Sequence, residues 1–188
     1  MRIKMLILFL LSLNVAFSQN AVQLTRFSLT VKGTSNLHDW ESEAKELRAT
    51  GSLTITEDAL STINSLTVEV PVKSIKSSKG SIMDGKTHKA LEANKHPNIS
   101  FKLSKATVNQ NGGRYDINAT RALTIAGTAN TVKLYVQGKK GSDGSYTFSG
   151  SKKLKMTDYK VDPPTALLGT LTTGDEVEIV FSVTLKPL

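Results

Sequence analysis

The stretch Val177-Glu-Ile-Val-Phe-Ser-Val-Thr-Leu185 decides the fold class of this chain of 188 residues. Apolar side chains recur at every second position, from Val177 through Phe181 to Leu185. Successive side chains of a β-strand point to opposite faces, so this segment would present one continuous apolar face. The pattern therefore predicts a half-buried strand near the C-terminus.

The same period of two recurs along the chain. It is found around residues 27–31, 51–55, 66–72, 99–103, 115–125, 132–136 and 146–154. Residues 41–49 have a mixed pattern that fits a polar strand or a short helix, and we interpret it as a strand. Residues 57–64 predict a loop with one helical turn. Pro71 cannot donate a ladder hydrogen bond, so we expect it at a strand end or edge.

Short polar segments separate the predicted strands. Asn109-Gln-Asn-Gly-Gly113 indicates a hairpin, because Asn and Gly tolerate positive φ. Residues 126–130 and 138–144 predict two more turns, a bulge is expected at Gly150, and residues 156–173 predict a long loop. Roughly eight or nine strands with tight turns and no βαβ period predict an antiparallel barrel or a sandwich. A barrel of about eight strands is just wide enough to hold one slender ligand.

Residues 81–101 contain the one helical pattern that we identify after the N-terminal segment. Its apolar face is predicted to carry Ile82, Met83, Ala90 and Leu91. Lys86 and Lys89 would lie on the other face, and Pro97 forbids further helix. A single short helix is therefore expected between strands of an otherwise all-β chain.

The composition narrows the classes of function. The chain has no Cys, which excludes disulfides, thiolate zinc sites, cysteine nucleophiles and a lipidated cysteine. The formal net charge is +8, and the lysines are spread along the chain. A solvated basic surface explains this spread, with attraction to anionic lipid headgroups as the alternative. Basic and aromatic residues are not interleaved, so nucleic acid is not an expected partner.

Residues 1–18 have the pattern of a cleaved export signal. Two basic residues precede an apolar run at residues 5–13, and Ala16-Phe-Ser18 offers small residues where a signal peptidase reads. We expect cleavage after Ser18, a single domain at residues 19–188, and a periplasmic or secreted location. A membrane anchor is the alternative, but a spanning helix needs about 20 apolar residues.

Three histidines, His38, His88 and His96, are the main candidates for chemistry. Asp39 next to His38, and Asp84 four residues before His88, are candidate base–orienter pairs. However, adjacent strand residues point to opposite faces, and the spacing of the histidines matches no metal site. Known hydrolase, zinc-protease, P-loop and dinucleotide motifs are missing. We therefore expect no enzyme, no catalytic residue, no metal and no cofactor.

Three other side chains have two interpretations each. Trp40, the only Trp, is more typical of a barrel-end plug or core residue than of a ligand platform. Met83 and Met156 are adaptable apolar groups that fill core gaps, and they would equally suit the wall of an apolar pocket.

Five stretches, in order along the chain, carry a resemblance to a known family. They are Val31-Lys-Gly-Thr-Ser-Asn-Leu-His-Asp-Trp40; Leu66-Thr-Val-Glu-Val-Pro-Val72 leading to Met83-Asp84 and Leu91; His96-Pro-Asn-Ile-Ser-Phe101; Leu123-Thr-Ile-Ala-Gly-Thr-Ala-Asn-Thr-Val-Lys-Leu134; and Leu154-Lys-Met-Thr-Asp-Tyr159 followed by Gly174-Asp-Glu-Val-Glu-Ile179. This ordered set resembles the YceI-like family of bacterial exported proteins.

The resemblance implies an extended, lipocalin-like antiparallel β-barrel without catalytic activity. It implies a long isoprenoid ligand, such as a polyprenyl phosphate or an isoprenoid quinone, held for carriage or storage. Met156-Thr-Asp-Tyr159 departs from the serine–x–phenylalanine–glycine-like turn of many members, and the segment with Pro163-Pro164 is shaped differently. The mouth of the barrel and its preference for a headgroup are expected to differ accordingly.

On this hypothesis the inward apolar side chains contact the lipid. The expected ligand-binding residues are Phe27, Leu29, Trp40, Val68, Val70, Met83, Leu91, Phe101, Leu123, Leu134, Phe148, Met156, Ile179 and Phe181. The helix would act as a lid, and Lys86, His88 or Lys89 would meet an anionic headgroup at the opening.

Other readings stay open at this point. A solid-cored secreted module that binds a protein or a surface is the main alternative, and a hydrolase using Asp84–His88 or His38–Asp39 is the least favoured. Transient contact with a membrane surface and a homodimer are both compatible with the sequence.

Overall fold

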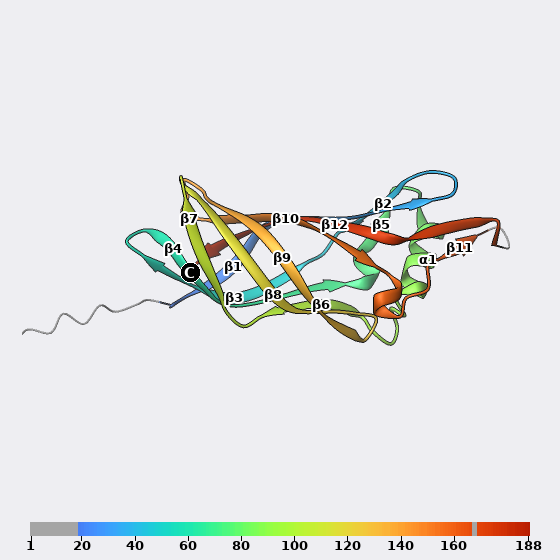
Figure 1. Cartoon of the computed structure of the whole chain (residues 1–188), viewed down its shortest axis with the longest axis horizontal. Coiled ribbons are helices and arrows are strands. Elements are labelled where there is room, and N and C mark those ends of the chain that lie inside the picture. Colours follow the sequence, from blue (N-terminus) through green and yellow to red (C-terminus); the bar gives the residue numbers. More distant parts are fainter. Residues whose placement is uncertain (1–18, 167–168) are drawn as a thin grey trace, which may run out of the picture.

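The computed structural model describes residues 19–166 and 169–188, which form an elongated antiparallel β-structure with one helix (Figure 1). The strands are β1 (Gln19–Ser35), β2 (Trp40–Ala44), β3 (Arg48–Thr56), β4 (Ala59–Pro71), β5 (Ile75–Ser77), β6 (Asn98–Leu103), β7 (Ala106–Asn111), β8 (Arg114–Ile125), β9 (Thr128–Lys140), β10 (Tyr146–Lys155), β11 (Thr165–Ala166) and β12 (Leu171–Pro187). The other elements are the helix α1 (Ser81–Ala90) and two 3-10 turns, η1 (Val72–Ser74) and η2 (Thr157–Tyr159). The expected export signal lies outside the described residues.

Eight strands close the barrel. In order around it they are β1, β3, β4, β6, β8, β9, β10 and β12, and β12 pairs back onto β1. β7 takes the place of β6 farther along the barrel, because it also pairs with β4 and β8. β2, β5 and β11 extend the sheet at the end where α1 lies (Figure 1). The predicted antiparallel barrel is thus confirmed, with extra strands that the sequence pattern did not resolve.

The tight turns follow from residues that accept positive φ. Gly112 and Gly113, at φ +55° and +80°, join β7 to β8 and confirm the predicted hairpin. Ala126 and Gly127, at +46° and +76°, join β8 to β9. Two successive positive φ values match the twist of the flanking strands. Residues 128–130, which we expected in this turn, belong to β9 instead.

The prediction of a loop with a helical turn at residues 57–64 is wrong. Only Glu57 and Asp58 form the turn, and β4 starts directly after them. The register of β3 against β4 shifts twice here, so the buried Leu60 and Ile63 are three residues apart. A spacing of three is typical of a helix, and the irregular pairing therefore disguised the strand.

Four further predictions about the strands and turns have mixed outcomes. Residues 41–49 contain strand as expected, interrupted between β2 and β3. β9 extends to Lys140, so the turn predicted at 138–144 is shorter. The register of β10 against β12 is unbroken, so the bulge expected at Gly150 does not occur. Gly150 is needed for space, because a Cβ there would lie 3.0 Å from the Phe181 ring. Residues 156–173 contain η2, β11 and the start of β12.

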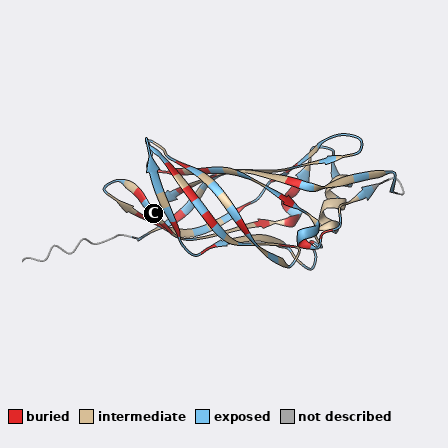
Figure 2. Cartoon of the chain, viewed as in Figure 1, coloured by how far each residue is buried: buried red, intermediate tan, exposed pale blue. Residues whose placement is uncertain are grey.

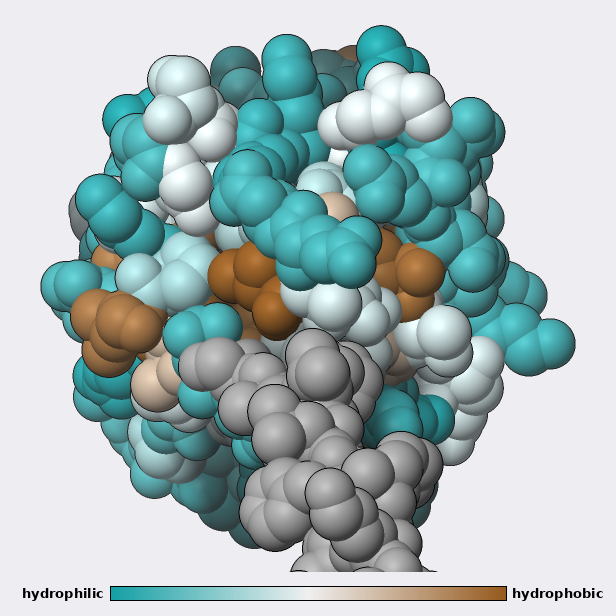
Figure 3. Space-filling view, turned by 90° about the vertical axis from the view of Figure 1, so that its left-hand side faces the viewer, coloured by the Kyte–Doolittle hydropathy of each residue, from teal (hydrophilic) through white to brown (hydrophobic). Residues whose placement is uncertain are grey.

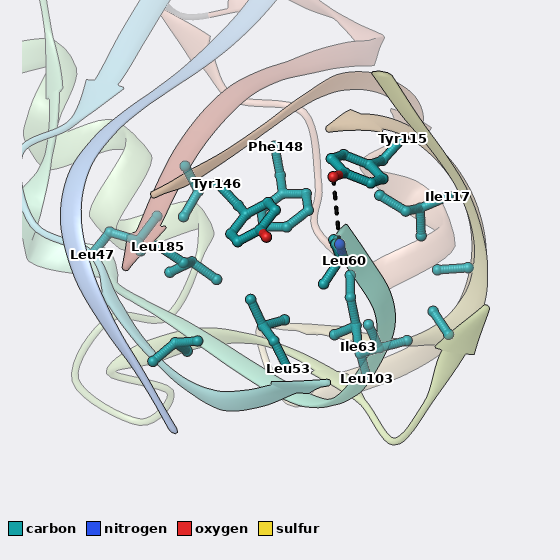
Figure 4. Close-up of a cluster of buried hydrophobic side chains, with 14 of the residues drawn as sticks. Leu47, Leu53, Leu60, Ile63, Leu103, Tyr115, Ile117, Tyr146, Phe148 and Leu185 are labelled. Carbon is teal, nitrogen blue, oxygen red and sulfur yellow. Dashed lines mark hydrogen bonds between the residues drawn. The ribbon is translucent and has the colours of Figure 1, made fainter. Parts of the chain in front are cut away.

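One end of the barrel is packed solid; we call it the packed end. Leu53 and Tyr146 are fully buried there, and the Tyr115 and Tyr146 rings meet edge-on with centroids 5.9 Å apart. The Leu60 amide donates to the Tyr115 hydroxyl at 3.4 Å (Figure 4). Seen from outside, hydrophilic side chains surround a small apolar centre at this end (Figure 3).

The opposite end carries α1 and a smaller apolar cluster around Tyr159 and Val161. Buried residues are interspersed with half-buried ones along the strands between the two ends (Figure 2). Within the described residues, no helix has both the length and the apolar character needed to cross a membrane.

Candidate functional site

Two adjoining chambers lie inside the barrel. The inner chamber has a volume of about 170 Å³, and 22 of its 23 lining residues are apolar. An apolar cavity of about 150 Å³ stays dry and accepts a benzene-sized group. The inner chamber is therefore suited to an apolar ligand rather than to water.

The outer chamber, between the inner one and α1, has a volume of about 120 Å³. Val31, Ile75, Ile99 and Ile179 line both chambers, and we call these four residues the waist. Polar side chains appear only beyond the waist, apart from one lysine in the inner chamber. Those of the outer chamber include Ser42, Ser77, Lys86, Thr87, Lys155 and Thr173. The two chambers therefore adjoin at the waist, and their lining becomes more polar toward the α1 end.

α1 forms one wall of the outer chamber through side chains spaced three and four residues apart. They are Met83, Lys86, Thr87, Ala90 and Leu91. The predicted helix faces were partly wrong, because Lys86 shares the inner face and Ile82 is 78% exposed. Residues 83, 86, 87 and 90 fall on one side of a helix with 3.6 residues per turn.

α1 is held by polar contacts at its sides rather than by a buried apolar face. The helix has no buried residue, and its N-cap, Gly80, makes no side-chain hydrogen bond. Lys86 Nζ donates to the Thr165 carbonyl oxygen at 2.8 Å, which joins α1 to β11. The outer chamber is thus bounded by an element that is itself only partly packed.

Asp84 and His88 attach α1 to β5 instead of forming a dyad. Asp84 Oδ1 accepts the Ser77 amide at 2.7 Å, and Lys76 Nζ lies 3.4 Å from its other oxygen. The Ser77 hydrogen bond is the main cause that lowers the pKa of Asp84. His88 Nε2 lies 3.0 Å from the Ile75 carbonyl oxygen, so this nitrogen donates its proton there. Both groups therefore serve structural contacts.

The other histidines lie apart from this pair. His38 Nδ1 is 2.8 Å from the Asp39 backbone oxygen, so the carboxylate of Asp39 is not its partner. The His96 ring covers the β8–β9 turn, where a Cβ on Gly127 would lie 2.4 Å from it. Across residues 19–166 and 169–188, no group of three or more metal-ligating side chains is assembled.

Most side chains predicted to contact a ligand line the chambers, although contact with a lipid stays a prediction. Those in the inner chamber are Leu29, Val68, Val70, Phe101, Leu123, Leu134, Phe148, Ile179 and Phe181. Those in the outer chamber are Trp40, Met83, Leu91, Met156 and again Ile179. Phe27 lines neither chamber; it packs against the larger cluster of buried side chains.

The three residues predicted to meet a headgroup are not gathered at one opening. Lys86 lines the outer chamber but donates to Thr165, and His88 is bonded to Ile75. Lys89 is exposed, on a side of α1 that lines neither chamber.

Trp40 is held in place at the wall of the outer chamber, and its contact with a ligand stays a prediction. Its Nε1 donates to the Thr34 carbonyl oxygen at 3.0 Å, and its ring lies over Gly33, where a Cβ would be 2.3 Å from it. The same ring lines the outer chamber. Trp40 is therefore a fixed part of the wall.

Sequence reasoning missed two polar side chains of the chamber walls. Lys152 is the one charged residue in the lining of the inner chamber. Alternation through Phe148 and Leu154 would have placed it inward, but only apolar residues were counted. Tyr159 lines the outer chamber, and its buried hydroxyl has no partner among the described residues. Burial raises the pKa of Tyr159, so the hydroxyl stays protonated and can donate.

The turn that carries Tyr159 is fixed by β12. Asp175 accepts the Thr157 amide at 2.9 Å and the Thr157 hydroxyl at 2.7 Å. These bonds lower the pKa of Asp175 and keep it ionised. η2 therefore forms a rigid corner of the outer chamber.

Solved structures share this architecture. A polyisoprenoid binding domain from Saccharophagus degradans aligns with a TM-score of 0.66 at 11% identity, covering 92% of this chain and 100% of that one. BcnA from Burkholderia cenocepacia aligns with a TM-score of 0.63 at 20% identity, and the alignment covers 84% of this chain and 95% of that one. The YCEI protein of Campylobacter jejuni aligns with a TM-score of 0.56 at 19% identity, and the alignment covers 97% of both chains. These likenesses show the fold.

Sequence comparison adds the family. A comparison with curated proteins gives no match. The model of the YceI-like domain, however, matches residues 13–185, which is nearly the whole chain. The barrel, the extra strands and this match together show that the chain belongs to the family of YceI-like domains.

Proposed function

We propose that the protein binds a long-chain isoprenoid lipid inside its barrel, for carriage or storage. The observation that carries the proposal is the pair of adjoining, mainly apolar chambers, which share the waist and so mark out a path of apolar wall along the barrel. A chain entering from the α1 end would meet mainly apolar walls along that path.

The energetics favour a long ligand. Each buried methylene contributes about 0.8 kcal/mol, so ten would contribute about 8 kcal/mol. Association costs about 4–15 kcal/mol of lost translational and rotational freedom. The gain grows with the length of the buried chain while this cost stays nearly constant, and two adjoining chambers offer apolar wall to a longer chain than one chamber does.

The isoprenoid class is supported by the family and by one structural relative. The Saccharophagus degradans domain, which has the same fold, is a polyisoprenoid binding domain. The walls here carry branched and aromatic side chains, such as Val68, Ile99 and Phe101, on all sides. These side chains suit a branched chain that fills the width of the path.

The two alternatives have less support. A solid-cored module requires a barrel without an internal cavity, whereas the described strands enclose two chambers. A hydrolase requires a base oriented by a carboxylate, whereas Asp84 and His88 are bonded to backbone groups of β5. We therefore favour a binding protein without catalytic activity.

The test is mass spectrometry of an organic extract from the purified protein. We expect one isoprenoid lipid in stoichiometric amount. Protein freed of lipid should then bind geranylgeraniol more tightly than the straight-chain alcohol of equal carbon number. An extract without lipid, combined with no binding of either alcohol, would refute the proposal.

We further propose export to the periplasm or the medium. Residues 1–18 have the composition of a cleaved signal, with small residues at the positions that a signal peptidase reads before Gln19. N-terminal sequencing of the protein from the cell envelope should then begin at Gln19.

A further inference from the structure

The barrel wall parts between β9 and β10. Their ladder covers only four pairs, from Tyr146 opposite Lys140 to Ser149 opposite Gln137. Beyond Ser149, both strands continue toward the α1 end, but the described residues form no further pairs between them. The parted region ends where Asn130 Nδ2 donates to the Asp158 carbonyl oxygen at 2.7 Å. A surface groove lies between these two limits.

Lys152 connects this groove to the interior. It pairs with Ile179, which pairs with Val31, and cross-strand partners face the same side of a sheet. Lys152 therefore points inward at the level of the waist. It lines both the inner chamber and the surface groove between β9 and β10. A lysine in this position packs its stem along apolar surface and keeps its ammonium in water.

Lys152 has no hydrogen-bond or ion-pair partner within the described part of the chain. Its neighbour Lys153, by contrast, donates to Glu176 at 2.9 Å. The difference follows from alternation, since the two side chains leave β10 on opposite faces. The inward cation is thus unneutralised at a position that borders both the inner chamber and the groove.

Tyr159 reaches the same wall from η2. It lines the outer chamber and the groove, it is 2% exposed, and its hydroxyl lacks a partner in the described structure. A buried hydroxyl without a hydrogen bond is unfavourable and rare. An acceptor brought by a ligand would satisfy it.

The groove is predominantly cationic. Lys133, Lys152, Lys153 and Lys155 line it, against Asp158 and Glu176. Glu176 is neutralised by Lys153, and Lys155 lies in the field of Asp175. Asp158 is the carboxylate that opposes an anion here. Lys133 and Lys152 remain to attract one.

We propose that the β9–β10 groove binds the phosphate headgroup of a prenyl phosphate whose chain lies in the chambers. Lys152 supplies the cation and Tyr159 donates a hydrogen bond, while Lys133 adds attraction from the rim. The inference rests on the proposed function, and it moves the headgroup from α1 to the side of the barrel. It also makes the ligand an anion rather than a neutral lipid.

The test compares geranylgeranyl monophosphate with geranylgeraniol, which has the same chain without the charge. Bonds to charged groups are strong, so we expect the wild-type protein to bind the phosphate about ten- to hundredfold more tightly. Lys152→Met should abolish this preference, measured as the ratio of the two affinities, whatever the substitution does to the binding of the alcohol itself. Tyr159→Phe should reduce the preference without loss of thermal stability, because the hydroxyl has no partner to lose.

Lys139→Met is the matched control. This exposed lysine lies on β9 outside the groove and both chambers, so the preference should persist in the variant. Inorganic phosphate alone should not compete at the concentrations used for the lipid.

The outcomes separate the two proposals. If the wild-type protein binds both lipids equally, or if Lys152→Met weakens both equally, the headgroup site is refuted and the lipid-binding function stands. If inorganic phosphate displaces the lipid as well as the prenyl phosphate does, the groove binds free phosphate instead, which also refutes the headgroup site. If neither lipid binds, the proposed function itself fails.

Discussion

The packed end and the hollow middle of this barrel are built from the same alternating pattern, yet one is solid and the other is not. At the packed end, Leu53, Tyr115 and Tyr146 are almost completely buried. In the middle, Leu29, Val68 and Leu134 face inward but are only half-buried, because they border the chambers. Rings that meet across the barrel fill one region, and smaller side chains leave the other open. Alternation therefore decides which residues face inward, and their size decides whether they touch.

Truncating one inward side chain in each region should give the largest difference, measured as the loss of free energy of unfolding. Leu53→Ala removes a fully buried side chain, and such changes cost about 2–5 kcal/mol of stability. Leu134→Ala removes a side chain that already borders a cavity, and we expect a loss of only about 1 kcal/mol, since less packing is removed. Urea denaturation of both variants measures the difference. Equal losses would mean that the middle is packed as tightly as the end.

Filling the middle tests the same comparison in the opposite direction. Val68→Phe places a ring in the inner chamber, so it should lower the affinity for geranylgeraniol by about tenfold or more, as lost burial of two or more methylenes implies. The midpoint of thermal unfolding should not fall, because the ring enters existing space.

Thr67→Phe is the control for this substitution, because the neighbouring side chain lies on the opposite face of β4. It should leave the affinity unchanged. A Val68→Phe protein that binds normally would show that the chain does not pass through the inner chamber.

Much of the fold was accessible from the sequence, because alternation and turn residues are local signals. The hairpin at Gly112 and Gly113, the strand end at Pro71 and the inward face of β12 were predicted and are confirmed. The start of β4 was missed, since two register shifts gave Leu60 and Ile63 a helix-like spacing. Register depends on the partner strand, and a single segment carries no signal for it.

The site was predictable only in part, for a related reason. Inward apolar residues were identified strand by strand, but the waist depends on which of them reach the same level of the barrel. Lys152 was overlooked because a lysine inside a barrel contradicts its usual exposure. It becomes interpretable only once β9 and β10 are seen to part beside it. Such a parting depends on where η2 and Asn130 lie, and this is a tertiary property.

The cover of the hollow region offers the smallest and most specific test. Gly85 lies within α1, and a Cβ there would meet nothing within 4 Å. Gly85→Ala should therefore stabilise the helix by about 0.5–1 kcal/mol, because alanine loses less backbone entropy than glycine. If α1 must open for the lipid to leave, release should slow about two- to fivefold, and amide exchange in α1 should slow with it.

Gly80→Ala should act in the opposite direction, although a Cβ there also meets nothing within 4 Å. Gly80 precedes α1 at φ +90°, a conformation that alanine adopts only under strain. The two substitutions add the same methyl group at either side of the first turn, so a difference in sign must come from the backbone of the helix. If both variants release the lipid at the wild-type rate, the lipid leaves without movement of α1. The parted wall between β9 and β10 would then be the remaining route.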